Sequence, residues 1–219
     1  MIKQLIFDCD GVLVDSEILS AEVMVNVLGK HGIEITLAYY LQNCTGKTFT
    51  GLRTEFSNQF NVSLPDSFLE EVMVDMGVKT KNELKQIVGI HKVLEKSKLP
   101  KAVVSNSYLY QIEHAINHIK IAHHFDNQLF SSQMASKPKP DPAIYLLAAE
   151  KLGVQPKECL VVEDSISGAT SALSAGMKVI GFVAGSHIID GHKQKLLDLG
   201  VVSVAENSDE LLEIITQYE

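Results

Sequence analysis

Arginine is almost missing from this sequence: Arg53 is the only arginine among 19 basic residues. The 27 acidic residues give a net charge of −8, so there is no surplus of positive charge to bind a nucleic-acid backbone. We therefore expect no nucleic-acid partner. Any anionic ligand must be held by lysine, hydroxyl groups, backbone amides or a metal ion.

Cysteine is also scarce, and tryptophan is absent. The three cysteines, Cys9, Cys44 and Cys159, lack the spacing of a metal site, so we expect buried free thiols and a reducing compartment. No uncharged apolar run approaches the roughly 18 residues that span a bilayer. The four residues between Lys3 and Asp8 are too few for the core of a signal peptide. These absences predict a cytoplasmic protein with no membrane partner, and we expect a monomer.

What the sequence does contain, from about residue 101 onward, is short β-branched runs that alternate with helical patterns. The runs lie at 102–104, 128–130, 160–162, 179–182 and 201–204. Amphipathic segments lie near 108–120, 141–152, 165–176, 189–199 and 207–217. Together with an apolar stretch at 3–8, this alternation predicts an α/β fold with a Rossmann-like, doubly wound parallel sheet.

The stretch 16–88 has a different pattern. Apolar residues such as Ile18, Ala21 and Val25 recur at helical spacing, and strand signals are nearly absent. We predict an α/β core formed by 1–15 and 89–219, and an all-α cap subdomain formed by 16–88 and inserted after the first strand. The alternative is a helical flank of a single domain.

Carboxylates follow two of the predicted strands. Asp8 and Asp10 follow the first strand, at alternate positions that could project to the same side. Glu163 and Asp164 follow the run 160–162. Open α/β sheets bind ligands at the carboxyl ends of their strands, and neighbouring carboxylates repel unless a cation or a shared proton intervenes. The pattern indicates a Mg²⁺ site, although the first pair alone could be an acidic turn.

Two further motifs could hold an anion. Ser105 and Asn106 follow the run 102–104 at the start of a predicted helix, where they could bind an anion or merely cap the helix. The proline-rich loop 136–142 contains Lys137 and Lys139. A lysine held in so stiff a loop could direct a fixed charge at phosphate, or it could remain in solvent.

In this order the four motifs resemble the haloacid dehalogenase-like superfamily, in its phosphatase and phosphomutase branch, over essentially the whole chain. The matching segments are Phe7-Asp8-Cys9-Asp10-Gly11 with Asp15-Ser16, Val104-Ser105-Asn106, Lys137-Pro138-Lys139-Pro140-Asp141, and Glu163-Asp164-Ser165 with Gly168. The inserted segment is similar to the helical cap that such enzymes carry.

The resemblance implies a Mg²⁺-dependent phosphatase that acts on a small phosphate ester through an aspartyl-phosphate. Asp8 would attack phosphorus, and Asp10 would protonate the leaving alcohol and later take a proton from water. Mg²⁺ would be held by Asp8, the Asp10 carbonyl and Asp164. Glu163 would be either a further ligand or a neighbour of one.

The resemblance also assigns the phosphate-binding groups. Ser105, Asn106 and Lys137 would hold the transferring phosphoryl oxygens and stabilise the charge that develops there. Lys137 is preferred to Lys139 because the family lysine precedes the first proline of the loop.

Two departures from the family's mutases favour hydrolysis. Ser20 and Phe49 stand where the β-phosphoglucomutase type carries a histidine and an arginine, although Lys47 or Arg53 could substitute for the latter. The preferred substrate class is a sugar phosphate or sugar-acid phosphate. Phosphoryl transfer between two sugar positions is the alternative, and a binding module that has lost turnover is a second.

Substrate choice in capped members is set by the cap. We expect Gly46 and Lys47 to contribute to it, although a surface lysine at a helix start is the plainer interpretation of Lys47. Outside the four motifs, His187 and His192 follow the run 179–182 and are candidates for the mouth of the site.

Overall fold

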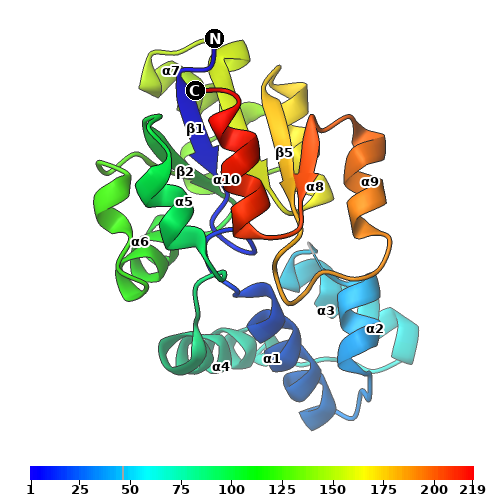
Figure 1. Ribbon diagram of the computed structural model, residues 1–219. Helices are drawn as coiled ribbons and strands as arrows, with labels where there is room; N and C mark the ends of the chain where they lie inside the picture. The colour runs from blue at the N-terminus through cyan, green and yellow to red at the C-terminus, as the bar shows by residue number, and fades with distance from the viewer. Residues whose placement is uncertain (46) are drawn as a thin grey trace. The chain divides into compact units, whose positions relative to one another are not determined.

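The computed structural model describes residues 1–45 and 47–219 (Figure 1). Its contacts divide the chain into two units, one formed by Met1–Asp15 with Lys85–Glu219 and the other by Ser16–Leu84. The larger unit resumes at Lys85, a few residues before the predicted boundary at residue 89, because residues 85–87 are bonded to 13–15. The Asp15 amide donates to the Lys85 carbonyl at 2.9 Å, and Val14 and Gln86 form an antiparallel bridge.

The larger unit is built on a six-stranded sheet in the order β3-β2-β1-β4-β5-β6, with every pairing parallel. Its strands are β1 Gln4–Phe7, β2 Lys101–Ser105, β3 Leu129–Ser131, β4 Cys159–Glu163, β5 Lys178–Phe182 and β6 Ser203–Ala205. The predicted doubly wound α/β fold is confirmed. Because the chain winds outward from β1 in both directions, the strand order reverses between β1 and β4, where such sheets bind ligands.

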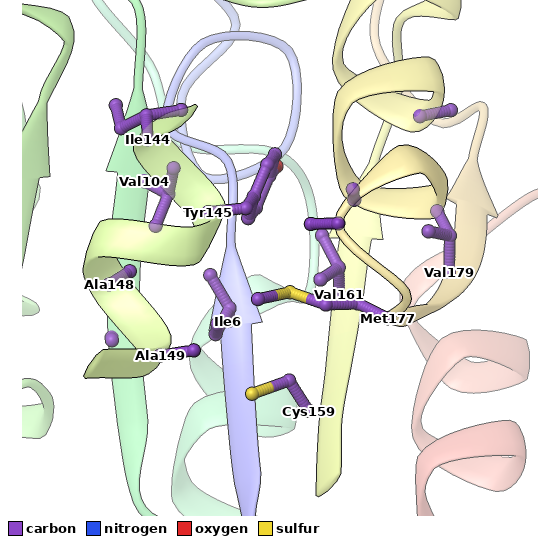
Figure 2. Packing of buried hydrophobic residues seen from close by; sticks show 14 of the residues in the cluster. Ile6, Val104, Ile144, Tyr145, Ala148, Ala149, Cys159, Val161, Met177 and Val179 are labelled. Carbon is purple, nitrogen blue, oxygen red and sulfur yellow. The ribbon is translucent and has the colours of Figure 1, made fainter. Parts of the chain in front are cut away.

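Helices cover the sheet on both sides. They are α5 Ile90–Lys96, α6 Leu109–His118, α7 Ala143–Leu152, α8 Ile166–Ser174, α9 His192–Leu199 and α10 Ser208–Thr216, with 3₁₀ turns at Ala122–His124, Ser132–Met134 and Pro156–Glu158. Buried residues of α7, α8 and α9 form one core cluster with the strands. Figure 2 shows Tyr145 and Ala148 of α7 against Ile6 of β1 and Val104 of β2. In Figure 1, α5 and α10 lie on the opposite side of the sheet from α7.

The smaller unit has its own core. Its helices are α1 Glu17–Lys30, α2 Leu37–Asn43, α3 Phe49–Phe60 and α4 Phe68–Glu83. The core side chains are buried and mostly apolar, among them Met24, Leu28, Tyr40, Phe56 and Phe68. Thr36 and Thr48 cap α2 and α3 by accepting hydrogen bonds from the Tyr39 and Gly51 amides, which fixes where these two helices begin.

No helix within the described residues is both long enough and apolar enough to cross a membrane.

Candidate active site

Strands β1 and β4 deliver three carboxylates to one place. The Asp8 amide still donates to the Val162 carbonyl at 3.0 Å, so Asp8 continues the sheet ladder just beyond β1. Glu163 is the last residue of β4, and Asp164 follows it. All three carboxylates are buried, and an oxygen of each lies within 4.8 Å of the others. Strand pairing thus brings together groups that are about 155 residues apart in the sequence.

Lys139 lies among these carboxylates and is itself buried. Its Nζ donates to Asp8 Oδ1 at 3.0 Å, to Glu163 Oε1 at 2.6 Å and to the Val104 carbonyl at 2.8 Å. Burial acts to lower the pKa of Lys139, but the charges of Asp8 and Glu163 raise it above its ordinary value, so the amine stays protonated. Burial, followed by the nearby Glu163, raises the pKa of Asp8 well above its usual range, against the pull of Lys139.

The prediction that Lys137, rather than Lys139, reaches the site is wrong. The Lys137 side chain is 70% exposed and lies 3.6 Å from Asp141, whereas Asn106 holds the backbone of Lys139. Asn106 Oδ1 accepts from the Lys139 amide at 2.9 Å, and Asn106 Nδ2 donates to the Lys139 carbonyl at 3.2 Å. Prolines alternate with charged residues through this loop, so the sequence offers two equivalent Lys-Pro steps. The step that directly precedes α7 is the one at Lys139.

Glu163 is held by protein donors on both oxygens. Oε1 accepts from Lys139 and from the Tyr145 hydroxyl at 2.7 Å, and Oε2 accepts from the Ser165 hydroxyl at 3.2 Å. A Cβ on Gly168 would lie 1.8 Å from Oε1, so only glycine fits there. Burial, together with Glu163, raises the pKa of Tyr145 and keeps its hydroxyl a donor. Sequence reasoning missed Tyr145 because an aromatic residue on the core side of a helix is ordinary packing.

Asp10 points toward the end of β2. Its Oδ2 accepts from the Ser107 hydroxyl at 2.7 Å and from the Ser105 hydroxyl at 3.3 Å. The Ser105 hydroxyl also accepts from the Ser107 amide at 3.0 Å, which closes a small network. Ser105, at the end of β2, therefore lies beside the Asp10 carboxylate. Ser107 was missed because it lies one residue beyond the motif.

Asp164 is contacted by both histidines that follow β5. His187 Nε2 lies 2.8 Å from Asp164 Oδ2, and both side chains are buried. His192 Nε2 donates to the Asp164 carbonyl at 2.6 Å. The sequence placed these histidines only loosely, at the mouth of the site.

The comparison with protein families agrees with this arrangement. A family model described as haloacid dehalogenase-like hydrolase matches residues 5–182. The chain belongs to the haloacid dehalogenase-like hydrolase family. It is therefore an enzyme.

Similar proteins of this family carry phosphatase names. The chain is 31% identical to a 6-phosphogluconate phosphatase of Escherichia coli over 187 residues, which cover 85% of each chain. It is 30% identical to a phosphorylated carbohydrates phosphatase of Thermotoga maritima, covering 98% of this chain and 99% of the relative. A solved haloacid dehalogenase-like protein of unknown function from Agrobacterium tumefaciens superposes with a TM-score of 0.92 at 30% identity, covering 99% of both chains.

The acidic cluster of this haloacid dehalogenase-like hydrolase fits a divalent cation. Carboxylate oxygens are the hard ligands that such ions prefer, and among the described residues the three buried carboxylates share one nearby ammonium group, that of Lys139. The hydrogen bonds to the Asp8 carboxylate within the described chain, from the Cys9 amide and from Lys139, both reach Oδ1. Oδ2 is thus left for another partner.

Gly46 and Lys47 are the two residues expected to contribute to substrate selection. Gly46 lies outside the described residues. Lys47, in the smaller unit, forms an ion pair with Glu55 at 2.7 Å, and both side chains are a little over two-fifths exposed. Its charge is therefore shared with Glu55 inside this unit.

Proposed function

We propose that this protein is a Mg²⁺-dependent phosphatase that hydrolyses a small phosphorylated metabolite through an aspartyl-phosphate. The observation that carries the proposal is the position of Asp8. It is buried at the end of β1, it is bonded through one oxygen to Lys139, and Asp10 lies two residues further on, held by two serines.

The residues support a two-step reaction. An Asp8 oxygen attacks phosphorus, the ester P–O bond breaks, and Asp10 gives its proton to the departing alkoxide. Water then attacks the acyl phosphate, Asp10 takes the proton from that water, and inorganic phosphate leaves with Asp8 restored. Ser107, whose hydroxyl donates to Asp10 Oδ2 at 2.7 Å, holds the Asp10 carboxylate in one rotamer for both transfers.

Asp8, Asp164 and the Asp10 carbonyl would hold Mg²⁺, with Glu163 adjacent. When bound, such an ion would offset the repulsion between the Asp8 carboxylate and an anionic phosphate. Lys139 supplies a second fixed positive charge and, with Ser105, would bind the transferring phosphoryl oxygens. Asn106 was expected to bind phosphate, but both ends of its amide hold the Lys139 backbone, so we assign it instead to placing that lysine.

For the substrate we propose a sugar phosphate or a sugar-acid phosphate. The support comes from the names of the two relatives, which act on 6-phosphogluconate and on phosphorylated carbohydrates. We propose that the helical unit serves as the cap, with Gly46 and Lys47 contributing to selection. We further propose that the protein works as a monomer in the cytoplasm, where its three free cysteines would stay reduced.

The test is phosphate release from a panel of sugar phosphates and sugar-acid phosphates, with Mg²⁺ or with EDTA, for the wild type and Asp8→Asn. We expect release that requires Mg²⁺, is abolished by the substitution, and is fastest on one of these two classes. Each sample is also followed by ³¹P NMR. Isomerisation of a hexose phosphate without release of phosphate would replace hydrolysis by the mutase alternative. Absence of both reactions would contradict an enzyme of this type.

A further inference from the structure

The side chains of His187 and Asp164 form a buried contact that is closely surrounded by backbone. Asp164 Oδ2 lies 2.8 Å from His187 Nε2, and the two side chains are only 3% and 4% exposed. A carboxylate oxygen accepts hydrogen bonds, so at this distance Nε2 of His187 carries the hydrogen and donates. Because water does not compete at this buried position, the hydrogen bond from His187 fixes the rotation of the Asp164 carboxylate.

Two glycines make room for this pair. Gly11 has φ +77°, and a Cβ there would lie 2.0 Å from Asp164 Oδ2 and 2.9 Å from His187 Cε1. A Cβ on Gly185 would lie 2.7 Å from both Cε1 and Nδ1 of His187. The imidazole thus packs directly against backbone on two sides, and any larger residue at either glycine would displace it.

The loop that carries His187 is anchored at several points. The Ser186 amide donates to Asp15 Oδ1 at 3.0 Å, and the Ser186 hydroxyl donates to Asp15 Oδ2. Further along, His192 donates to the backbone carbonyl of Asp164. The main chain of Asp164 and one of its carboxylate oxygens are therefore both held by residues that follow β5.

We propose that His187 is a positioning residue for Asp164, which sets how tightly the site binds its divalent cation. Donation to Oδ2 holds the carboxylate in a single orientation and leaves Oδ1 for the ion. Removing such a supporting hydrogen bond from a metal ligand typically weakens metal affinity by about 10- to 100-fold. This inference rests on the proposed function, because it takes Asp164 as a metal ligand.

Metal binding is measured directly, without substrate. Purified protein is titrated with Mn²⁺, and free Mn²⁺ is followed by its electron paramagnetic resonance signal. We expect His187→Leu to raise the dissociation constant by about 10- to 100-fold, and His187→Gln, whose amide can still donate near the Nε2 position, to stay within about threefold of the wild type. Ser186→Ala is the matched control in the same loop, because its side chain bonds to Asp15 and not to Asp164.

The outcomes separate this inference from the proposed function. Equal Mn²⁺ affinity in the wild type and His187→Leu overturns the role of His187 and leaves the metal-dependent phosphatase standing. Equal weakening by His187→Leu and Ser186→Ala also overturns it, since the loop as a whole would then support Asp164. A wild type that binds no Mn²⁺ overturns both.

Folding is checked by circular dichroism. Should His187→Leu fail to fold, His187→Gln is compared with His187→Asn, whose shorter amide cannot reach Oδ2 without moving the backbone. The asparagine variant is expected to bind more weakly than the glutamine variant, and equal affinities would contradict the proposal.

Discussion

At the scale of single residues, the site is a balance of buried charges. Lys139 is the ammonium group that neutralises Asp8 and Glu163, and all three are buried. Removing one member of a buried group of charges leaves the remaining charges unneutralised. This lowers the stability of the folded protein far more than the loss of an exposed ion pair does. The two lysines of the proline-rich loop therefore give a controlled comparison.

We expect Lys139→Met to lower the free energy of unfolding by about 3–5 kcal/mol and to abolish turnover. Lys137→Met should change stability by less than about 0.5 kcal/mol, because its exposed pair with Asp141 is screened by water. Urea denaturation followed by circular dichroism measures both. Equal effects of the two substitutions would be incompatible with the geometry described above.

Gly168 gives a second comparison at this scale. A methyl group at this position collides with Glu163, so Gly168→Ala should destabilise the protein by about 1–3 kcal/mol and reduce activity. Gly77, inside α4, has no atom within 4 Å of its missing Cβ, so Gly77→Ala should stabilise by about 1 kcal/mol. Urea denaturation measures both variants: the midpoint should fall for Gly168→Ala and rise for Gly77→Ala. A higher midpoint for Gly168→Ala would contradict the close contact with Glu163.

Predictability from sequence differs between backbone and side chains. The sequence allowed a prediction that five polar residues gather at one edge of the sheet, because each follows an apolar run and the carboxyl ends of parallel strands meet at the same edge. These residues are Asp8, Asp10, Ser105, Glu163 and Asp164. The lysine that contacts the carboxylates could not be identified in this way, because the loop contains two Lys-Pro steps, at Lys137 and Lys139.

Residues outside the motifs were harder still. Tyr145 and Ser107 carried no signal that separates them from ordinary packing or loop residues. Their contacts with Glu163 and Asp10 depend on side-chain directions that only the folded chain reveals.

At the scale of elements, periodicity predicted most helices and all six strands within a few residues. The short helix α5 was missed, because no helical pattern was recognised between residue 89 and the run 102–104; Gly89, in the left-handed conformation, begins it. Burial differs strongly between elements. All five residues of β4 are buried, but only Tyr40 of α2 and two residues of α3 are.

Hydrogen exchange should follow this difference in burial. Amides of β1 and β4 are expected to exchange slowest, since opening them exposes the centre of the sheet, while α2 and α3 should exchange fastest among the regular elements. Mass spectrometry of peptides after deuterium labelling measures this. Protection of α2 equal to that of β4 would contradict the expectation.

At the scale of the whole molecule, the larger unit keeps three carboxylates out of water beside one lysine. A cation that binds only the folded state adds a free energy that grows with its concentration, about 2.7 kcal/mol at 100 times the dissociation constant. For a chain of this size that corresponds to a rise in Tm of roughly 5–10 °C.

We therefore expect Mg²⁺ to raise the Tm of the wild type, and to raise that of Asp164→Asn much less, in calorimetric scans. The difference between scans with Mg²⁺ and with EDTA isolates the ion from any change that the substitution itself makes to stability. A shift of the same size in both proteins would show that the ion binds elsewhere.

The backbone pairing between 13–15 and 85–87 has a consequence for how this enzyme could change over time. Because the chain leaves and re-enters the larger unit through two adjacent, mutually bonded segments, a piece of almost any length can join them without disturbing the sheet. The helical unit is, in engineering terms, a replaceable insert. A lineage, or a protein engineer, could exchange it for another while the strand ends of β1 and β4 keep their side chains in place.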